Sequence, residues 1–343
     1  MSNYDWFRPR QRRQHLFIVE GKHEKNELMK LLLKSFPEID MDLDDVIVYG
    51  TNIYQLYLDI NREYEDDWEE VDLPFIVSKK KGYKTPVRKT DFINIVLVFD
   101  YERHDPNFSE EKILKMQTYF VDSADAGQLY LNYPMIESYQ HLLAIPDSDY
   151  ADRSVPVNLQ PGLQYKNLVK NTMVSNIVRL PLKLKEILAE RFHVTDEEVC
   201  DQCVEGLLSI KETNFLLEQI ETILSGVVMG RSLVTAKYQL ADTLQQCGYL
   251  SAGLAYYRYT RYLFAHIIRH NICKANKILR GMYEIESGLL KDCFISLDLK
   301  EILRVQNNVS RDKEQGFIWV LNTYVFFIPD YNFQLLEQDE YKL

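Results

Sequence analysis

The stretch His15-Leu-Phe-Ile-Val-Glu-Gly-Lys22 contains a short apolar run that ends abruptly at an acidic residue and a glycine. A run of this kind, closed by a turn signal, predicts a buried strand at 15–19. Leucines at helical spacing predict a helix over 24–36, and the same signals return as a strand at 46–50, a helix at 52–64 and a strand at 93–99. Alternating strands and helices predict an α/β fold with a mostly parallel sheet.

The second half of the chain has a helical pattern. Apolar residues recur at three- and four-residue spacing in segments 168–188, 196–209, 212–226, 232–247, 252–279 and 284–293. We therefore expect two domains, a catalytic α/β domain at 1–150 and a mainly helical assembly domain at 160–343, with the boundary in the proline-containing stretch 147–162. The apolar segment 317–328 (FIWVLNTYVFFI) predicts a late strand that returns to a core, with a short buried helix as the alternative.

Composition limits the function classes. The 343 residues include 40 basic and 51 acidic ones, for a net charge of −11. This charge excludes a protein coated uniformly with basic residues, but it permits an enzyme with a local basic patch. The sequence has no apolar run long enough for a membrane span and no secretory signal, and its five cysteines are scattered. We expect a cytoplasmic protein without a membrane partner.

Acidic residues end three of the apolar runs. Glu20 follows the first strand, Asp100 and Glu102 follow the strand at 93–99, and Glu137 follows the segment NYPMI at 132–136. Because parallel sheets place their chemistry beyond the carboxyl ends of the strands, these acids are candidates for one site. Asp100 and Glu102 would point to the same side if strand geometry continued, and carboxylate oxygens suit Mg²⁺ or Mn²⁺. Any one of these acids alone is more simply interpreted as solvated.

Taken together, these motifs resemble the Toprim domain of topoisomerases, primases and nucleases, a Rossmann-type fold. The resemblance covers residues 14–145 and rests on Glu20-Gly21, on Gly50 and on Asp100-Tyr-Glu102, where the family has Asp-x-Asp. The segment NYPMIESY is similar to the Asn-Pro-x-Phe-Glu signature of the RloB-like and OLD-like Toprim nucleases of bacterial defence systems, a group that includes the nuclease subunit of the PARIS system.

This resemblance implies a metal-dependent nuclease that acts as the effector of an antiphage system. Glu20, Asp100 and Glu102 would be catalytic, and these three together with Glu137 would hold Mg²⁺ or Mn²⁺, with Asp105 as a spare ligand. The resemblance also implies an ABC-type ATPase partner, because many Toprim nucleases of defence systems work with one. The chain has no Walker A motif, so any dependence on ATP would come from elsewhere. The substrate is left open between DNA and RNA or tRNA.

Basic residues suggest where nucleic acid would bind. Six of them fall within eleven positions, and Lys22 follows the first acidic motif; the six are Lys79, Lys80, Lys81, Lys84, Arg88 and Lys89. We expect these six to lie in a loop at the far end of the strand that leads to Asp100, ~20 Å from the acids. The alternative is a solvated loop opposite the acidic stretch 63–72. Arginines at positions 8, 10, 12 and 13 form a second basic cluster.

Other functions are also compatible with the sequence. Arg261-Tyr-Leu-Phe-Ala-His266 fits the loose Arg-x4-His pattern of HEPN ribonucleases, which would cleave RNA without a metal. A degenerate Toprim domain that acts only as an interaction module is a third hypothesis. Cys200 and Cys203 lack a second pair at zinc spacing, so packing is favoured over zinc binding. The helix expected at 252–279 carries aromatic residues nearly all round, which predicts burial in a bundle or in a subunit interface, and hence a homodimer or a complex with an ATPase.

Overall fold

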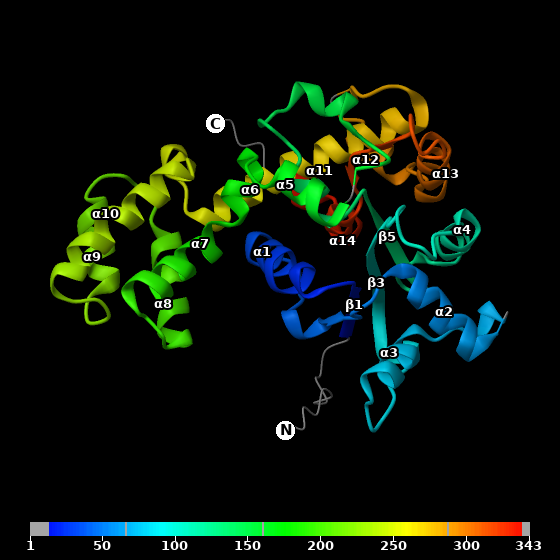
Figure 1. Cartoon of the computed structure of the whole chain (residues 1–343), viewed down its shortest axis with the longest axis horizontal. Helices are drawn as coiled ribbons and strands as arrows, with labels where there is room; N and C mark the ends of the chain where they lie inside the picture. Colours follow the sequence, from blue (N-terminus) through cyan, green and yellow to red (C-terminus); the bar gives the residue numbers. More distant parts are fainter. Residues whose placement is uncertain (1–13, 66, 160, 287, 338–343) are drawn as a thin grey trace.

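The protein is described by a computed structural model over residues 14–65, 67–159, 161–286 and 288–337. The arginine cluster expected at positions 8 to 13 lies outside these residues. The structure is a mixed α/β fold in which a mostly parallel central sheet is flanked by helices (Figure 1). The coarse fold class predicted from the sequence is therefore confirmed.

The central sheet contains six strands in the order β2-β1-β3-β5-β4, with β8 paired to β5. Strands β1, β2, β3 and β5 run parallel, whereas β4 and β8 are antiparallel. The bounds are β1 (Gln14–Val19), β2 (Val46–Val48), β3 (Phe92–Asp100), β4 (Val121–Asp122), β5 (Gly127–Tyr133) and β8 (Leu321–Asn322). Val19 pairs with Val48 on one side and with Val98 on the other, so β1 is fully enclosed in the sheet.

Both faces of the sheet are covered, which explains why its central strands are continuous apolar runs. Helices α2 (Ile53–Tyr64) and α4 (Glu110–Tyr119) lie on one side, and α1 (Lys30–Ser35) and α14 (Phe327–Asn332) lie on the other (Figure 1). Helix α3 (Leu73–Lys81) contains the apolar residues at 75–77. Side chains cap the first turns of α2, α3 and α4, because Asn52, Asp72 and Ser109 each accept a backbone N–H three residues later.

The segment expected to form one helix at 168–188 is divided into shorter helices. These are α5 (Lys166–Val169), α6 (Met173–Val178) and α7 (Leu180–Glu186). The breaks follow from two residues inside the segment. Thr172 caps α6 by accepting the Ser175 N–H, and Pro181 occupies the first turn of α7, where its missing N–H costs nothing. Local chemistry therefore overrides the apolar periodicity here.

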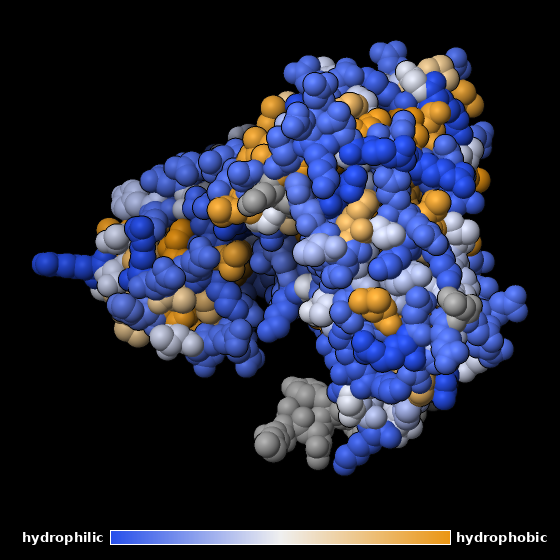
Figure 2. Space-filling view, turned by 45° about the vertical axis from the view of Figure 1, so that its right-hand side comes forward, coloured by the Kyte–Doolittle hydropathy of each residue, from blue (hydrophilic) through white to orange (hydrophobic). Residues whose placement is uncertain are grey.

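The remaining helices of the described chain are three in a projecting lobe, one long helix that joins the lobe to the body, and three in the body itself (Figure 1). The lobe contains α8 (Glu197–Ser209), α9 (Leu216–Leu224) and α10 (Gly230–Gln246), the joining helix is α11 (Tyr256–Arg280), and the body holds α12 (Leu290–Ile295), α13 (Leu299–Val309) and α15 (Gln334–Glu337). Helix α11 runs from the lobe made by α8, α9 and α10 into the body that holds the sheet (Figure 1). The surface is hollowed between the lobe and the body (Figure 2). Lys34 of α1 bridges this gap by pairing with Glu205 of α8 and donating to the Tyr257 hydroxyl (3.1 Å).

The C-terminal segment returns to the core, as its composition predicts. Strand β7 (Phe317–Trp319) pairs with β6 (Ser154–Pro156), and β8 adds to the edge of β5 in the central sheet. The second half of the expected strand is helical, and it covers the sheet: the ring of Phe327 in α14 lies 5.3 Å from the ring of Phe17 in β1. The chain after residue 160 is thus built into the sheet as well as into the lobe.

Helix α11 is buried within its own chain. Its buried residues face α1, α12, α13 and the strand β8, so the burial that its aromatic composition requires is supplied without a second subunit. Lys274 is fully buried on this helix. Its ammonium donates to the backbone carbonyls of Tyr150 (2.9 Å), Ala151 (2.7 Å) and Arg153 (2.9 Å) and lies 4.4 Å over the Trp319 ring.

No helix in the described parts of the chain is long and apolar enough to cross a membrane.

Replacing Lys274 by Met should lower the free energy of unfolding by about 3 kcal/mol, because three buried carbonyls lose their donor at once. Urea unfolding measures the change. Lys277→Met is the matched control one turn away, where the partner Asp152 is exposed; its effect should stay below about 1 kcal/mol. Equal losses in the two variants would show that the carbonyl contacts of Lys274 do not hold α11 in place.

Candidate active site

The acidic motifs meet at the point where the chain changes direction in the sheet. Strand β2 pairs with one side of β1 and strand β3 with the other, so the carboxyl ends of β1 and β3 form a topological switch point. Glu20 directly follows β1, and Asp100 is the last residue of β3. Strand β5 is the next parallel neighbour, and it leads to Glu137. The three acidic motifs therefore follow neighbouring parallel strands at the same edge of the sheet.

Glu20 and Asp100 are in direct contact. The backbone N–H of Asp100 donates to Glu20 Oε2 (3.4 Å), and the N–H of Gly50 donates to the Glu20 carbonyl (2.9 Å). Burial raises the pKa of Glu20 to about 8, with a further contribution from the charge of Glu102. The Asp100 side chain is only 5% exposed, and burial together with Glu20 raises its pKa well above the usual range. The two carboxyl groups therefore cannot both ionise easily.

Glu102 reaches this cluster by a different route from the one expected. Strand β3 ends at Asp100, and Glu102 has a left-handed backbone (φ 48°), so the strand geometry that would align Asp100 with Glu102 does not continue. The condition on which Asp100 and Glu102 were expected to share a strand face is therefore not met. Burial nevertheless raises the pKa of Glu102, and its charge acts on Glu20. A turn after β3, and not the strand itself, therefore brings Glu102 to the cluster.

Glu137 lies in a short 3-10 helix, Ile136–Gln140, just beyond β5. It is 6% exposed, and its Oε1 accepts from the ammonium of Lys166 (2.9 Å). Its Oε2 is buried without a hydrogen-bond partner among the described residues. One face of this carboxylate is therefore unsatisfied inside the protein, which is a costly arrangement without a ligand.

Glu24 is a member of the cluster that the sequence analysis did not identify. It begins the helical turn after Gly21 and is 7% exposed. Burial raises its pKa, and its Oε2 also has no hydrogen-bond partner in the described chain. A Cβ at position 21 would lie 2.8 Å from this oxygen, so glycine makes room for it. The spacing in Glu20-Gly-Lys-His-Glu24 could have identified Glu24 as a member of the cluster. The fourth residue after Glu20 lies in the first turn of the following helix, and this turn brings its side chain back toward the end of the strand.

Two cationic groups face the acids and were also missed. His23 lies between Glu27 (3.1 Å) and Glu137 (4.0 Å). Burial is the largest single influence on its pKa and lowers it, but the hydrogen bond to Glu27 and the charges of the neighbouring glutamates together raise the pKa above its ordinary value. Lys166 comes from α5, on the far side of the proline-containing stretch. Burial would lower the pKa of Lys166, yet the charges of Glu137 and Asp100 raise it. Nothing in the sequence marks Lys166, because only the fold brings α5 to this edge.

Asp105, expected as a spare ligand, has both oxygens engaged. Oδ2 accepts from the Asn52 amide (2.5 Å) and Oδ1 from the Asn107 N–H (2.6 Å). Since Asn52 also caps α2, Asp105 fastens the loop after β3 to the start of that helix. Asp105 therefore holds this loop in place, and because both of its oxygens already accept hydrogen bonds it is less suited to bind a metal ion.

The basic residues at 79–89 are placed differently from the expected loop. Lys79, Lys80 and Lys81 form the last turn of helix α3, Lys84 and Arg88 lie in the exposed loop that follows, and Lys89 begins a 3-10 helix. Four of these residues face acids of the same chain, in the pairs Lys79–Glu63, Lys80–Asp59, Arg88–Asp72 and Lys89–Asp125. This pairing matches the alternative of a solvated basic segment opposite an acidic one.

One of these lysines also lies nearer the acids than expected. The Lys80 ammonium donates to Thr51 Oγ1 (2.9 Å), and Thr51 follows Gly50, whose N–H bonds to Glu20. The reason is that Lys80 belongs to a helix packed beside α2 and not to a loop at the far end of β3. Lys22 is exposed directly after Gly21.

The residues of the alternative functions serve in packing. The Arg261 guanidinium bonds to both oxygens of Glu38 (2.8 and 2.7 Å) and lies 4.9 Å over the Phe36 ring, which fastens α11 to the segment after α1. The His266 ring lies 4.4 Å from the Tyr262 ring, and burial lowers its pKa to about 4. Cys200 and Cys203 are buried free thiols on α8.

The donor set fits a hard divalent cation in its chemistry. Carboxylates that are buried, mutually repelling and partly unsatisfied are the groups that such a cation would neutralise. In the parts of the chain that the structure describes, no three of these side chains already surround one point in ligating geometry. Side-chain rotation would be needed to close a shell. Comparisons with protein-family models, with curated proteins and with solved structures give no match.

Replacing Glu20 by Gln should raise the free energy of unfolding at pH 7 by about 3 kcal/mol. The raised pKa means that the folded chain keeps a proton that the unfolded chain releases above pH ~4.5, so wild-type stability falls as pH rises toward about 8. The Glu20→Gln variant has no carboxyl group at this position, so its stability should not fall in this way. The difference in unfolding free energy between the two proteins should disappear at the acidic end of the pH range. Urea unfolding across this pH range measures it.

Glu27→Gln is the matched control on the adjoining helical turn. The His23 contact lowers the pKa of Glu27, so its charge stabilises the fold at neutral pH and the variant should be less stable than wild type. Destabilisation by Glu20→Gln at pH 7 would contradict the account of a strained acid cluster.

Proposed function

We propose that this protein is a metal-dependent nuclease whose active site is the acid cluster of Glu20, Glu24, Asp100, Glu102 and Glu137. The observation that carries the proposal is the burial of several carboxylates at the switch point of a parallel sheet, with one oxygen each of Glu24 and Glu137 lacking a hydrogen-bond partner among the described residues. Buried acids of this kind are concentrated at catalytic sites.

Asp100, Glu24 and Glu137 are the carboxylates that would hold Mg²⁺ or Mn²⁺, because they are the most deeply buried members. A bound divalent cation would supply positive charge against the negative charge that develops on a phosphodiester under attack. Glu102, which the turn after β3 places near Glu20, would be a further ligand of the metal ion on that side.

Glu20 is suited to move a proton. Its raised pKa lies near neutrality, where a carboxyl group can exchange a proton with an attacking water or a leaving oxygen. The Asp100 N–H contact holds its Oε2 at the strand end. Lys166 supplies a positive charge beside Glu137. Its ammonium can contact a phosphate group once the Glu137 carboxylate binds the metal ion instead of the lysine.

The substrate class is nucleic acid, either RNA, including tRNA, or DNA. This assignment and the role as an antiphage effector with an ABC-type ATPase partner rest on the sequence resemblance to Toprim nucleases of defence systems. The six basic residues at 79–89 contribute less to the proposal than the sequence suggested, since four of them are paired with acids.

Cleavage of single-stranded RNA, tRNA or plasmid DNA should require Mg²⁺ or Mn²⁺ and stop in chelator. Glu20→Gln and Asp100→Asn should each reduce the rate by about 10³-fold or more while the circular dichroism spectrum stays unchanged. His266→Ala, a change at a half-buried position on α11, is the control and should retain cleavage. Full activity in chelator, abolished by His266→Ala, would replace this proposal with the HEPN hypothesis. Binding without cleavage would support the interaction-module hypothesis.

Replacing Lys166 by Met should strengthen Mg²⁺ binding, since the acids lose a competing positive charge, and should slow cleavage at saturating Mg²⁺ by about tenfold. Calorimetric titration of Mg²⁺ and single-turnover rates measure the two effects. Lys170→Met, four residues further along the same segment, should change neither. Unchanged Mg²⁺ affinity in the Lys166 variant would show that this lysine is not part of the site.

A further inference from the structure

A basic cavity lies on the short helices that join the body to the lobe. Its volume is about 390 Å³, and it is lined by α6, by α7, by the end of α10 and by the turn between α5 and α6. Figure 1 shows α5, α6 and α7 leading from the body that holds the sheet toward the lobe. Leu182 lines this cavity and also a second one of about 420 Å³ between α1, α7 and α8, so the two cavities adjoin.

The charge of the lining is mostly positive. Lys170, Arg179 and Lys183 line the cavity together with one acid, Glu186. The sequence around them follows the same bias, because residues 154–185 contain five basic residues and no acidic one, although 51 of the 343 residues are acidic. On a protein with a net charge of −11, such a segment creates a local positive potential that attracts anions.

Arg179 and Lys183 have no acidic partner within the described chain. Both side chains are exposed, and neither makes an ion pair or a side-chain hydrogen bond among the described residues. Lys185, two residues further along α7, differs from them, because it pairs with Glu197 (3.3 Å) and Asp201 (2.7 Å) of α8. The two basic groups at the cavity are therefore available to a negatively charged ligand.

The two basic side chains project from the same side of the helix. Arg179 directly precedes α7, and its carbonyl accepts the backbone N–H of Lys183 (3.0 Å), so the two residues lie one helical turn apart. The exposed amide side chains of Asn176 and Gln246 line the same cavity. A guanidinium and an ammonium group with neutral N–H donors beside them form a donor set that suits a phosphate group.

This cavity lies close to the acid cluster. The hydrogen bond with His23 is the largest influence that lowers the pKa of Glu27, and the charges of Arg179 and Lys166 lower it further. His23 also contacts Glu137 of the cluster (4.0 Å), and Lys166 pairs with the same carboxylate. Arg179 is therefore within electrostatic range of the groups that surround the cluster, and a strand bound at the cluster can extend over α6 and α7.

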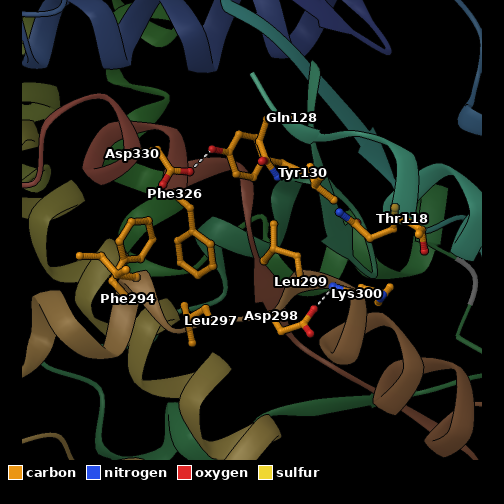
Figure 3. Close-up of a pocket in the computed structure, with 13 residues that line it drawn as sticks. Thr118, Gln128, Tyr130, Phe294, Leu297, Asp298, Leu299, Lys300, Phe326 and Asp330 are labelled. Carbon is orange, nitrogen blue, oxygen red and sulfur yellow. Dashed lines mark hydrogen bonds between the residues drawn. The ribbon is translucent and has the colours of Figure 1, made fainter. Parts of the chain in front are cut away.

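The cavity between β5 and the C-terminal helices does not suit a phosphate group. Asp298 and Asp330 line it, with Lys300 as the basic residue among its lining residues (Figure 3). The Tyr130 hydroxyl donates to Asp330 at its edge (Figure 3). Because these acids would repel an anion, the basic cavity on α6 and α7 is the better candidate for contact with nucleic acid.

We propose that Arg179 and Lys183 bind a backbone phosphate of the nucleic-acid strand that the acid cluster cleaves, at a position away from the cut. The inference rests on the proposed function for the nature of the ligand, since the cavity by itself selects only a phosphate group. Contacts with backbone phosphates position a strand without reading its sequence. Substrate binding is thus assigned to α7, whereas four of the six basic residues at 79–89 are paired with acids.

Fluorescence anisotropy of labelled single-stranded RNA and DNA of one sequence tests this proposal. Every protein in the test is the full chain with Glu20→Gln, so that binding is measured with Mg²⁺ present and without cleavage. Arg179→Gln combined with Lys183→Gln should weaken binding about tenfold and lower the slope of log affinity against log salt concentration by about 0.7 or more, because at least one phosphate contact is lost.

Lys211→Gln combined with Arg231→Gln is the matched control, because it removes the same charge from exposed positions on the lobe. It should change the affinity by less than about twofold, since it alters only the long-range potential. Arg179→Lys combined with Lys183→Arg keeps both charges and should retain binding, which separates loss of charge from local misfolding. Inorganic phosphate at millimolar concentration should not displace the strand.

The proposal is overturned if neither strand binds, if Arg179→Gln with Lys183→Gln leaves the affinity unchanged, or if the control pair weakens binding equally. Displacement by inorganic phosphate would also overturn it and would assign the cavity to a small anion. Cleavage by the chain with Glu20 intact is measured separately. Binding that depends on the cavity without any cleavage would overturn the proposed function alone, whereas cleavage with unchanged binding by the double variant would overturn this inference alone.

Discussion

The parallel pairing of β1 with β3 is the constraint on which the rest of this structure depends. Because β2 lies on the other side of β1, the order of the strands reverses between β1 and β3, and their carboxyl ends form a topological switch point. Glu20 and Asp100 stand at that switch point by their positions in the strands alone. Every other member of the acid cluster is brought to them by a turn or by a more distant element.

The cluster concentrates like charges where burial already opposes ionisation. Raised pKa values at Glu20, Asp100, Glu24 and Glu102 have the same first cause, which is loss of hydration, and mutual repulsion adds to it. Lys166 and His23 compensate only part of this charge, since one oxygen of Glu24 and one of Glu137 are left without hydrogen bonds in the described chain. The native state therefore carries a local electrostatic cost that a cation would relieve.

The second half of the chain contributes to the sheet and to the acid cluster. Strand β8 and helix α14 complete the sheet, and α5 carries Lys166 to the acids. Buried Lys274 and the Arg261–Glu38 pair fasten α11 to the segments around it. The aromatic surface of helix α11 suggested a subunit interface, but helix α11 packs against α1, α12, α13 and β8 of its own chain.

The sequence by itself determined the strands at 15–19 and 93–99, the position of Glu20 and Asp100 at their ends, and the return of the apolar C-terminal segment, because each follows from local apolar runs and chain order. It did not assign β5 or α4, and it misplaced Glu102 and Lys80, since turn geometry and helix packing decide where those side chains point. Tertiary structure alone decided that Lys166 reaches the acids and that one oxygen each of Glu24 and Glu137 has no hydrogen-bond partner among the described residues. These features arise from contacts between segments far apart in the chain, and no local pattern records which segments will meet.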